Sequence, residues 1–395
     1  MSGLSEEIQF RQKKRRKRKM QIIRSIGSVF IVIFMIGLMV FFYYRRNGYY
    51  KNAEVKMSIK TKSEYDEYFA QLDGKVLAYS SQGVRLIDED GTCIWKESID
   101  VPNPIEAISG NYVIIADQGG TCVNVFGEQG LLNSFQTDAS IIQVDIASNG
   151  KMAILSEDDQ NCYLSVYKSN GKKLEIQKKY SLKQRIFPVD VAISPNGNEL
   201  VTNFLNMSSG TVVSTIAFFD FSKAGKQGDN IEANQLEGGT IYNNELVPKV
   251  DFCDETTAVI YREQGFSLYP MAEKTSKQKM IDVDFKHPVH SIASSDQYLF
   301  FLLELDSKDY KYEAQIYDKC GKKIGNFRTD FAATDVVMDD ESIILHNFSE
   351  YYVYTTKGKM RFHQITTDPV ETVLPCNYNS FFVVCADKIK RTQLT

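Results

Sequence analysis

The stretch LIDEDGTCIW, residues 86–95, contains the features from which the fold can be predicted. An apolar run leads to Asp88, Gly91 follows, and Trp95, the only tryptophan of the chain, lies four residues further on. Gly adopts the positive φ of a tight turn without steric cost, and an Asp side chain can accept bonds from nearby backbone N–H groups. We therefore predict a structural corner of strand, turn and strand, in which Trp95 packs between neighbouring units of the fold.

Similar corners recur along the chain, and a short apolar run that is typical of a buried strand accompanies each of them. The corners are VRLIDEDG (84–91), VNVFGEQG (123–130), LSVYKSNG (164–171), AQIYDKCG (314–321) and YVYTTKG (352–358). The apolar runs, eight in all, begin at residues 75, 111, 151, 198, 256, 297, 341 and 379. Most steps between the runs are about 40 residues, which is the length of one β-propeller blade.

A further strand, ending in a small turn, precedes the apolar runs, so that each unit contains four antiparallel strands. Examples are QVDIASNG (143–150), PVDVAISPNG (188–197), KVDFCDE (249–255) and TDVVMDD (334–340). Four-stranded units repeated around an axis form a β-propeller. We predict an all-β fold with eight blades, and seven blades as the alternative. The step between the fourth and fifth runs is longer, and the polar residues 223–245 are expected to form a surface loop there.

The two ends of the predicted ring are expected to join. The eighth unit stops one strand short of four at the C-terminus, whereas residues 52–60, NAEVKMSIK, alternate apolar and polar ahead of the first unit. We predict that residues 52–60 supply the missing outer strand, because this arrangement leaves no free sheet edge between the two ends.

The N-terminal region differs in kind from the rest of the chain. Residues 25–44 carry no charge, and as a helix they would span about 30 Å of hydrocarbon. The positive-inside rule then predicts a cytoplasmic tail at 1–24, a transmembrane helix at 25–44, a linker at 45–51 and an extracytoplasmic propeller at 52–395. The basic residues that set this topology are Arg11, Lys13, Lys14, Arg15, Arg16, Lys17, Arg18 and Lys19.

Two other interpretations of the N-terminal region fit less well. A cleaved signal peptide would have a shorter apolar region followed by small residues, which FFYYRRNGYY (41–50) lacks. The basic run could also be a nucleic-acid or nuclear-import patch. Beside a membrane span, however, we expect it to set topology and to contact anionic lipid headgroups. The expected partner of this region is the membrane, and no nucleic acid is expected.

The part of the chain after residue 46 is acidic, with 35 basic and 48 acidic residues and a net charge near −13. Such a surface argues against a nucleic-acid partner and against docking on an anionic membrane. Its seven cysteines are widely spaced and include no CxxC pair, so neither a zinc site nor a dense disulfide framework is expected. Only Cys376 and Cys385 are close enough in sequence to suggest a bridge across a hairpin.

No sequence motif points to catalysis, since GxSxG, HExxH, P-loop and GxGxxG patterns are all absent. His287 and His290 form the only close histidine pair, and a strand would place them on opposite faces. We therefore expect no catalytic residue, no metal and no cofactor. Four aspartates at matching positions of first strands could face a central channel and bind a cation, but we expect them to bond to turns and backbone N–H groups; they are Asp145, Asp190, Asp251 and Asp335.

The corner at Asp88, Gly91 and Trp95 resembles the repeat of quinoprotein-like propellers, in which an apolar-Asp stretch is followed by Gly and then by Trp. The units with AISPNG look more like WD40 and TolB propellers. The whole layout, a basic tail, one anchor and a divergent propeller, resembles an uncharacterised family of Firmicute membrane proteins. The resemblance implies a propeller of this kind, but Trp occurs in only one of the corners, and the quinone cofactor of quinoproteins is not expected.

These observations predict a single-pass membrane protein of the cell envelope with an extracytoplasmic propeller. Its expected role is that of a non-catalytic interaction platform that recruits another envelope protein or a cell-wall polymer. The alternatives are a cofactor-dependent oxidoreductase, a glycan-acting enzyme, or a ligand-binding sensor. A channel with convergent carboxylates and a cation-sized cavity would favour an enzyme, whereas an exposed apolar patch on one face would favour the platform.

Overall fold

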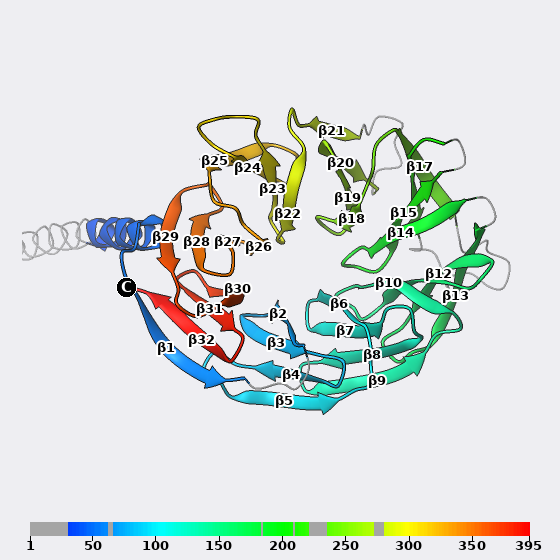
Figure 1. The fold of residues 1–395 in the computed structure, drawn as a ribbon, viewed down its shortest axis with the longest axis horizontal. Coiled ribbons are helices and arrows are strands. Elements are labelled where there is room, and N and C mark those ends of the chain that lie inside the picture. Colours follow the sequence, from blue (N-terminus) through cyan, green and yellow to red (C-terminus); the bar gives the residue numbers. More distant parts are fainter. Residues whose placement is uncertain (1–30, 62–65, 183–184, 208–209, 221–234, 272–279) are drawn as a thin grey trace, which may run out of the picture. The chain divides into compact units, whose positions relative to one another are not determined.

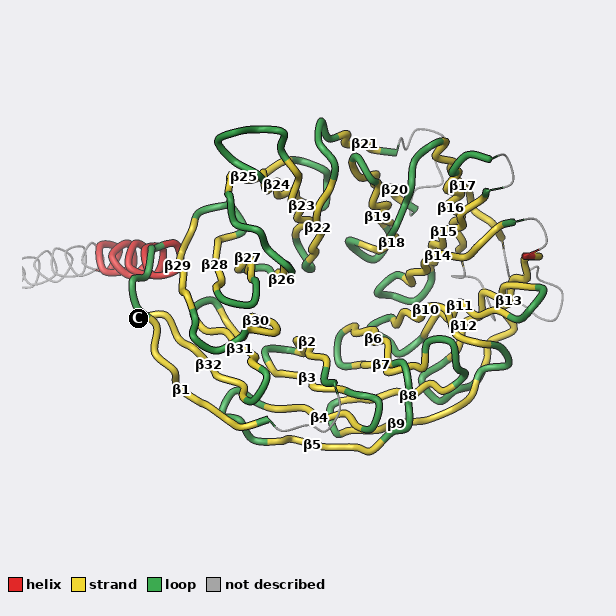
Figure 2. Tube along the Cα trace, viewed as in Figure 1, coloured by secondary structure: helices red, strands yellow, loops and turns green. Residues whose placement is uncertain are grey.

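The computed structural model describes residues 31–61, 66–182, 185–207, 210–220, 235–271 and 280–395. The chain divides into two compact units, residues 1–49 and 50–395. In the first unit, residues 31–47 are helical (Figure 2). Within the ranges given above, no helix is both long and apolar enough to cross a bilayer. The predicted span at 25–44 is described only from residue 31 onward, and the basic residues from Arg11 to Lys19 lie outside the described part.

The second unit is an all-β propeller of eight four-stranded antiparallel sheets, as predicted from the repeat (Figure 1). The strands of the first four blades, from the innermost outward, are β2 (Tyr68–Leu72), β3 (Lys75–Tyr79), β4 (Gly83–Ile87) and β5 (Cys93–Ser98); β6 (Pro104–Ser109), β7 (Tyr112–Asp117), β8 (Cys122–Gly127) and β9 (Gly130–Gln136); β10 (Ser140–Ile146), β11 (Met152–Glu157), β12 (Asn161–Tyr167) and β13 (Lys173–Ser181); and β14 (Ile186–Ile193), β15 (Glu199–Asn206), β16 (Val213–Asp220) and β17 (Gln235–Asn243).

The remaining four blades follow in the same order around the ring. Their strands are β18 (Lys249–Phe252), β19 (Thr257–Arg262), β20 (Gly265–Pro270) and β21 (Ile281–Asp284); β22 (Val289–Ser294), β23 (Tyr298–Glu304), β24 (Tyr312–Asp318) and β25 (Lys323–Thr329); β26 (Asp335–Met338), β27 (Ser342–His346), β28 (Glu350–Thr355) and β29 (Met360–Ile365); and β30 (Val370–Asn377), β31 (Ser380–Cys385), β32 (Lys388–Leu394) and β1 (Ala53–Lys60).

The eight apolar runs of the sequence are the second strands of the blades, and they are covered on both faces. All six residues of β31 are buried, and so are five of the six residues of β11. Each of the eight hydrophobic clusters is built from two neighbouring blades, and together they fill every interface around the ring. Burial on both faces explains why these strands are apolar throughout instead of alternating.

The ring is closed by an N-terminal strand. β1 pairs antiparallel with β32, from Ala53 opposite Leu394 to Lys60 opposite Lys388, and is the outer strand of the eighth blade. Met57 and Ile59 of β1 pack against the cluster between the eighth and the first blade. The two ends of the propeller are thus held by both backbone pairing and apolar contact, which is the pairing expected for residues 52–60.

The strand order fixes which connections share a face of the propeller. The turns between first and second strands and between third and fourth strands lie on one face, here called the turn face. The turns between second and third strands, together with the crossovers from one blade to the next, lie on the opposite face, here called the crossover face. The backbone N–H of Tyr50 donates to the carbonyl of Arg361, near the start of β29, so the chain enters the propeller at the turn face.

Two expectations from the sequence are wrong. Residues 235–243 are not loop but the strand β17, because pairing with β16 overrides their polar, Gly-rich composition. Gly238 of β17 lies so close to Tyr269 that a Cβ there would be 2.9 Å from its hydroxyl oxygen. Cys376 and Cys385 are free thiols. Cys385 lies opposite Val370, whereas Cys376 lies at the other end of the same hairpin, beside the turn.

Candidate functional site

The first strands of the blades surround the axis of the ring, and Figure 1 shows β2, β6, β10, β14, β18, β22, β26 and β30 around the central opening. These strands contain the four aspartates predicted from the sequence. In each case one carboxylate oxygen accepts the backbone N–H of the next residue or of the neighbouring blade, as expected; the aspartates are Asp145, Asp190, Asp251 and Asp335.

Two of these aspartates join neighbouring blades. Asp145 accepts the N–H of Ile193 in the fourth blade at 2.7 Å. Asp190, which is buried, accepts the N–H of Val250 in the fifth blade at 2.9 Å. Each blade is a separate four-stranded sheet, so these carboxylates add to the few backbone bonds between blades, such as that from the Ser148 N–H to the Pro195 carbonyl. Their role is to fix the third, fourth and fifth blades relative to one another.

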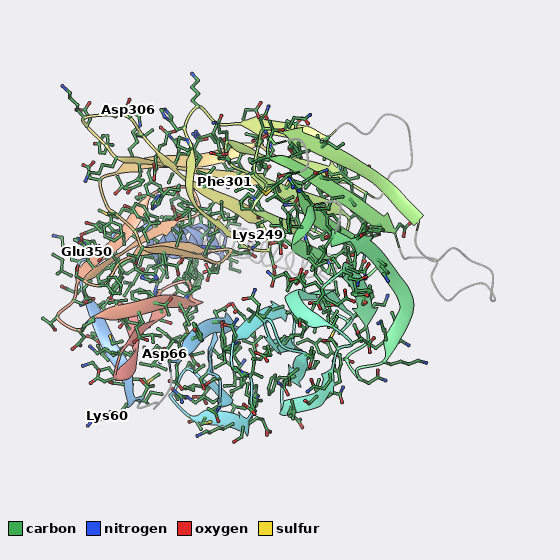
Figure 3. The ribbon with its side chains drawn as sticks, turned by 45° about the vertical axis from the view of Figure 1, so that its right-hand side comes forward. Lys60, Asp66, Lys249, Phe301, Asp306 and Glu350 are labelled. Atoms are coloured by element: carbon green, nitrogen blue, oxygen red, sulfur yellow. The ribbon has the colours of Figure 1, made fainter. Side chains whose placement is uncertain are left out.

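A charged group beside these aspartates was not anticipated from the sequence. The Lys249 Nζ atom lies 3.5 Å from Asp251 Oδ2 and 5.8 Å from the centre of the Tyr261 ring. The Asp251 carboxylate raises the pKa of Lys249, and burial raises the pKa of the Tyr261 hydroxyl. Figure 3 labels Lys249 on the inner side of the ring and Asp306 on a projecting loop at its outside. In the sequence, Lys249 is visible only as a charged residue within the stretch PKVDF (248–252), and nothing there indicates its position beside the aspartates.

The Asp145 carboxyl has an unusual electrostatic setting. Burial, together with the nearby Asp251 carboxylate, raises the pKa of Asp145 to about 8, against the opposing effect of its bonds from Ile193 and Ile146. Burial also raises the pKa of Asp190 to about 6. Lys249 therefore balances the Asp251 carboxylate, while Asp145 favours its neutral form. The shifted pKa values of these aspartates and of Lys249 are of the kind found in acid–base sites. Their hydrogen bonds to backbone N–H groups, however, indicate a structural role.

In the seventh blade, Asp335 faces a histidine from the second strand. His346 is buried, and its Nε2 atom lies 3.6 Å from Asp335 Oδ2, which lowers the pKa of Asp335. Neither ring nitrogen of His346 has a hydrogen-bond partner within the described residues. His287 precedes β22 and is not part of a strand, while His290 Nδ1 lies 2.9 Å from Glu304 Oε1. The two histidines of HPVH therefore do not form a shared site.

A hollow of about 660 Å³ opens near the axis on the turn face. It is lined by first-to-second turns of the first, second, sixth and seventh blades, and its charged side chains are all acidic: Asp73, Asp296, Asp339, Asp340 and Glu341. Several of them are engaged in local bonds. Asp339 caps its own turn by accepting the N–H groups of Glu341 and Ser342. The Asp340 carboxylate accepts the N–H of Gln297 in the sixth blade at 2.9 Å.

The charged groups of the channel and of the hollow differ in what they are able to bind. Within the described ranges, no group of three or more His, Cys, Asp or Glu side chains could hold a metal ion. The channel carboxylates are bonded to backbone N–H groups, and Lys249 is paired with Asp251. The hollow could hold a small cationic group by charge alone.

The corner predicted from the sequence is built as a turn. Gly91 has a φ of 84°, and Asp88 Oδ1 accepts the N–H groups of Asp90 and Thr92 at 3.0 and 2.7 Å. Trp95 is 8% exposed and stacks on Phe126 of the second blade, with ring centres 5.5 Å apart. Asp88 and Gly91 thus shape the turn, and Trp95 packs between the first and second blades.

Apolar side chains are exposed on the crossover face, above all in the fourth and seventh blades. In the seventh blade, Phe348 is 69% exposed and Ile365 is 70% exposed. Ile365 lies opposite Glu350 in the β28–β29 ladder, and Val370 N–H donates to the Phe348 carbonyl, so the two side chains belong to one edge of this face. The fourth blade also exposes apolar side chains there, from Phe187, Met207, Val212 and Leu246. Isolated loop positions such as Phe348 carry no periodic signal and were not identified from the sequence.

A family model described as a family of unknown function, DUF5711, matches residues 44–394. No curated protein matches the chain. Among solved structures, BamB from Moraxella catarrhalis is similar at 12% identity, with a TM-score of 0.50, and covers 87% of this chain and 100% of its own. A eukaryotic initiation factor is similar at 10% identity, with a TM-score of 0.52 and coverages of 85% and 87%.

Apo AztD from Citrobacter koseri is similar at 11% identity, with a TM-score of 0.50, and covers 78% of this chain and 88% of its own. At such identities, the likeness to these three structures establishes the propeller fold alone.

Proposed function

We propose that this chain, which belongs to the family of unknown function DUF5711, is a non-catalytic interaction platform that binds a protein partner through its crossover face. A rigid ring suits this role because it presents loops from several blades in fixed positions. The partner would be another protein of the cell envelope, which contacts apolar side chains of the crossover face.

One observation carries the proposal, namely the exposure of Phe348 and Ile365 on one edge of the crossover face. Large exposed apolar side chains are unfavourable in water, and their burial in a protein interface lowers the free energy. Aromatic anchors of this kind supply much of the binding energy of protein–protein interfaces. The aspartates of the channel, by contrast, bond to the fold itself, and Lys249 pairs with one of them, so they support a structural role rather than a reaction.

We also propose that residues 25–44 anchor the platform in a membrane. The support is a run of 20 residues without charge, preceded by the basic run at 11–19. In this arrangement residues 1–24 lie in the cytoplasm and the propeller lies outside it. Anchoring would confine the platform to the envelope and raise the encounter frequency with membrane-bound partners.

The test is a double substitution, Phe348→Ser with Ile365→Ser, in the full chain expressed in its host. Crosslinking in intact cells should give a specific product with the unchanged chain, and the double variant should lose at least about 80% of it, as expected when central apolar anchors are removed. Leu132→Ser is the matched control, since Leu132 is 55% exposed and lies on the outer strand β9. Equal crosslinking in both variants would contradict the proposed face.

A ligand-binding sensor is the second candidate function, and the acidic hollow on the turn face favours it. Its ligand would be a small organic cation, held by charge. Thermal unfolding with a panel of polyamines would separate the candidates. A rise in melting temperature that disappears in Asp296→Asn with Asp340→Asn would support the sensor, and an unchanged melting temperature would remove it.

A further inference from the structure

Five lysines gather on one side of the turn face, and we call them the basic rim. They lie beside the point where the chain enters the propeller and in third-to-fourth turns of the sixth and seventh blades; they are Lys51, Lys319, Lys322, Lys357 and Lys359. Lys319 is half-buried and the others are exposed. Within the described residues, none of the five ammonium groups has an ion-pair partner.

The rim is contiguous because the two turns pack against each other. A Cβ on Gly325, just after the turn of the sixth blade, would lie 2.7 Å from the backbone of Lys357 in the turn of the seventh. Tyr50 bonds to Arg361 through its backbone N–H at 2.7 Å, which places Lys51 beside the strand that follows Lys359. The lysines therefore form one surface and are not scattered charges.

The charge of the rim is not shared by the first and second blades, although the corresponding turn of the third blade also contains Lys168 and Lys172. The same turn in the first blade contains Asp88, Glu89 and Asp90, and in the second blade it contains Glu128. In the turns of the rim the only acidic residue is Asp318, whose carboxylate accepts the N–H groups of Cys320 and Lys322. The net charge near −13 argues against docking of the whole surface on an anionic membrane, and the acidic hollow of the turn face is lined in part by the same two blades. The outer turns of these blades nevertheless carry a local cluster of positive charge, which can bind an anionic partner.

We propose that the basic rim docks on anionic lipid headgroups of the membrane that residues 25–44 are proposed to cross. This inference rests on the anchoring part of the proposed function. Tyr44 ends the apolar run, and the chain from there to Tyr50 can reach at most about 20 Å when fully extended. This short connection allows the rim to come within the Debye length of an anionic bilayer, about 8 Å at physiological ionic strength, where lysines are drawn to the surface. The overall acidity of the propeller then repels its remaining surface and orients the rim toward the lipid.

The test uses the full chain in vesicles and follows the alkylation rate of Cys320, an exposed thiol within the rim. An uncharged polyethylene glycol maleimide is the reagent, because its concentration at the surface does not depend on the surface potential. Cys93, the other exposed thiol, is replaced in all variants by Cys93→Ser. The matched position is Gln129→Cys, which places an exposed thiol in the equivalent turn of the second blade, on the opposite side of the ring.

Docking should slow the alkylation of Cys320 at least about fivefold when neutral phosphatidylcholine vesicles are replaced by vesicles with a third of anionic phosphatidylglycerol. About 0.5 M salt should restore the rate, because it shortens the Debye length to a few ångströms. A triple substitution in the rim should also restore the alkylation rate of Cys320; it combines Lys322→Gln, Lys357→Gln and Lys359→Gln. The control is a triple substitution elsewhere in the ring, Lys96→Gln on β5 with Lys168→Gln and Lys172→Gln in the corresponding turn of the third blade. It removes the same charge and should leave the protection intact.

Equal rates in both kinds of vesicle, or equal slowing at Cys320 and at Gln129→Cys, would overturn the docking inference. Stronger protection of Cys320 by soluble polyphosphate in neutral vesicles would also overturn it, in favour of an anionic polymer. An alkaline carbonate wash, which removes proteins that are not inserted in the bilayer, separates the docking inference from the proposed membrane anchor. Retention of the chain with an unprotected Cys320 removes docking alone, whereas release of the chain contradicts the anchor and docking together.

Discussion

Single residues of this propeller act mainly at the boundaries between blades, and Trp95 is the clearest case. It is 8% exposed, it stacks on Phe126, and its Nε1 atom has no hydrogen-bond partner among the described residues. Trp95→Ala should lower the free energy of unfolding by about 3–5 kcal/mol, because it leaves a cavity between two blades. Urea unfolding measures this change.

Trp95→Phe is the control for this prediction. It preserves the stacking on Phe126 and removes an N–H group that has no partner among the described residues. The free energy of unfolding should therefore fall by less than half as much as in Trp95→Ala. A cost below about 1 kcal/mol for Trp95→Ala would show that the contact between the blades adds little.

The carboxyl of Asp145 should make stability depend on pH. Its pKa is raised from 3.8 to about 8, so the folded state binds the proton more tightly than the unfolded chain does. The stabilising contribution is complete below about pH 4 and is lost as the pH rises through about 8. The free energy of unfolding should therefore fall between pH 5 and pH 8.

Asp145→Asn should reduce this decrease, most clearly between pH 6 and pH 8, because Asp190, with a pKa of about 6, also contributes at lower pH. The amide gives up one backbone bond and so lowers stability at every pH. Asp159 is exposed, and Asp159→Asn serves as the control, which should keep the pH dependence of the unchanged chain. An identical slope in Asp145→Asn and in the unchanged chain would mean that Asp145 is ionised in the folded protein across this range.

Among the elements, β1 determines whether the ring is closed. It pairs along its length with β32 and contributes Met57 and Ile59 to the contact between the eighth and first blades. A chain that starts at residue 61 should lose at least about 5 °C of melting temperature relative to one that starts at residue 49, since backbone pairing and apolar burial are both lost. It should also self-associate through the free edge of β32. Equal melting temperatures for the two chains would show that closure does not depend on β1.

The second strands and the corners could be predicted from the sequence because their signals are local. Apolar runs covered on both faces, and Asp and Gly in turns, recur with the length of a blade, as in the run at 151 and the turn at Asp88. β17 was missed because its Gly-rich sequence becomes a strand only through its pairing with β16. Lys249 and Phe348 were missed for a related reason: their surroundings come from other strands or loops, which no local pattern encodes.

At the scale of the whole molecule, the two faces of the propeller differ in chemistry. The turn face combines an acidic hollow near the axis with a basic rim at one side, whereas the crossover face exposes apolar side chains on the fourth and seventh blades. In the proposed arrangement, the rim holds the turn face toward the lipid and leaves the crossover face free for a protein partner. The acidity of the remaining surface would keep the propeller soluble beside the membrane.

The central claim, binding of a protein through the crossover face, is tested most directly by site-specific photo-crosslinking in intact cells. A photoreactive residue in place of Phe348 should give a discrete crosslinked product, and the same residue in place of Leu132 on β9 should give none. Substitution of Ile365 by Ser should weaken the product formed from position 348. Equal products from both positions, or no product from position 348, would contradict the account.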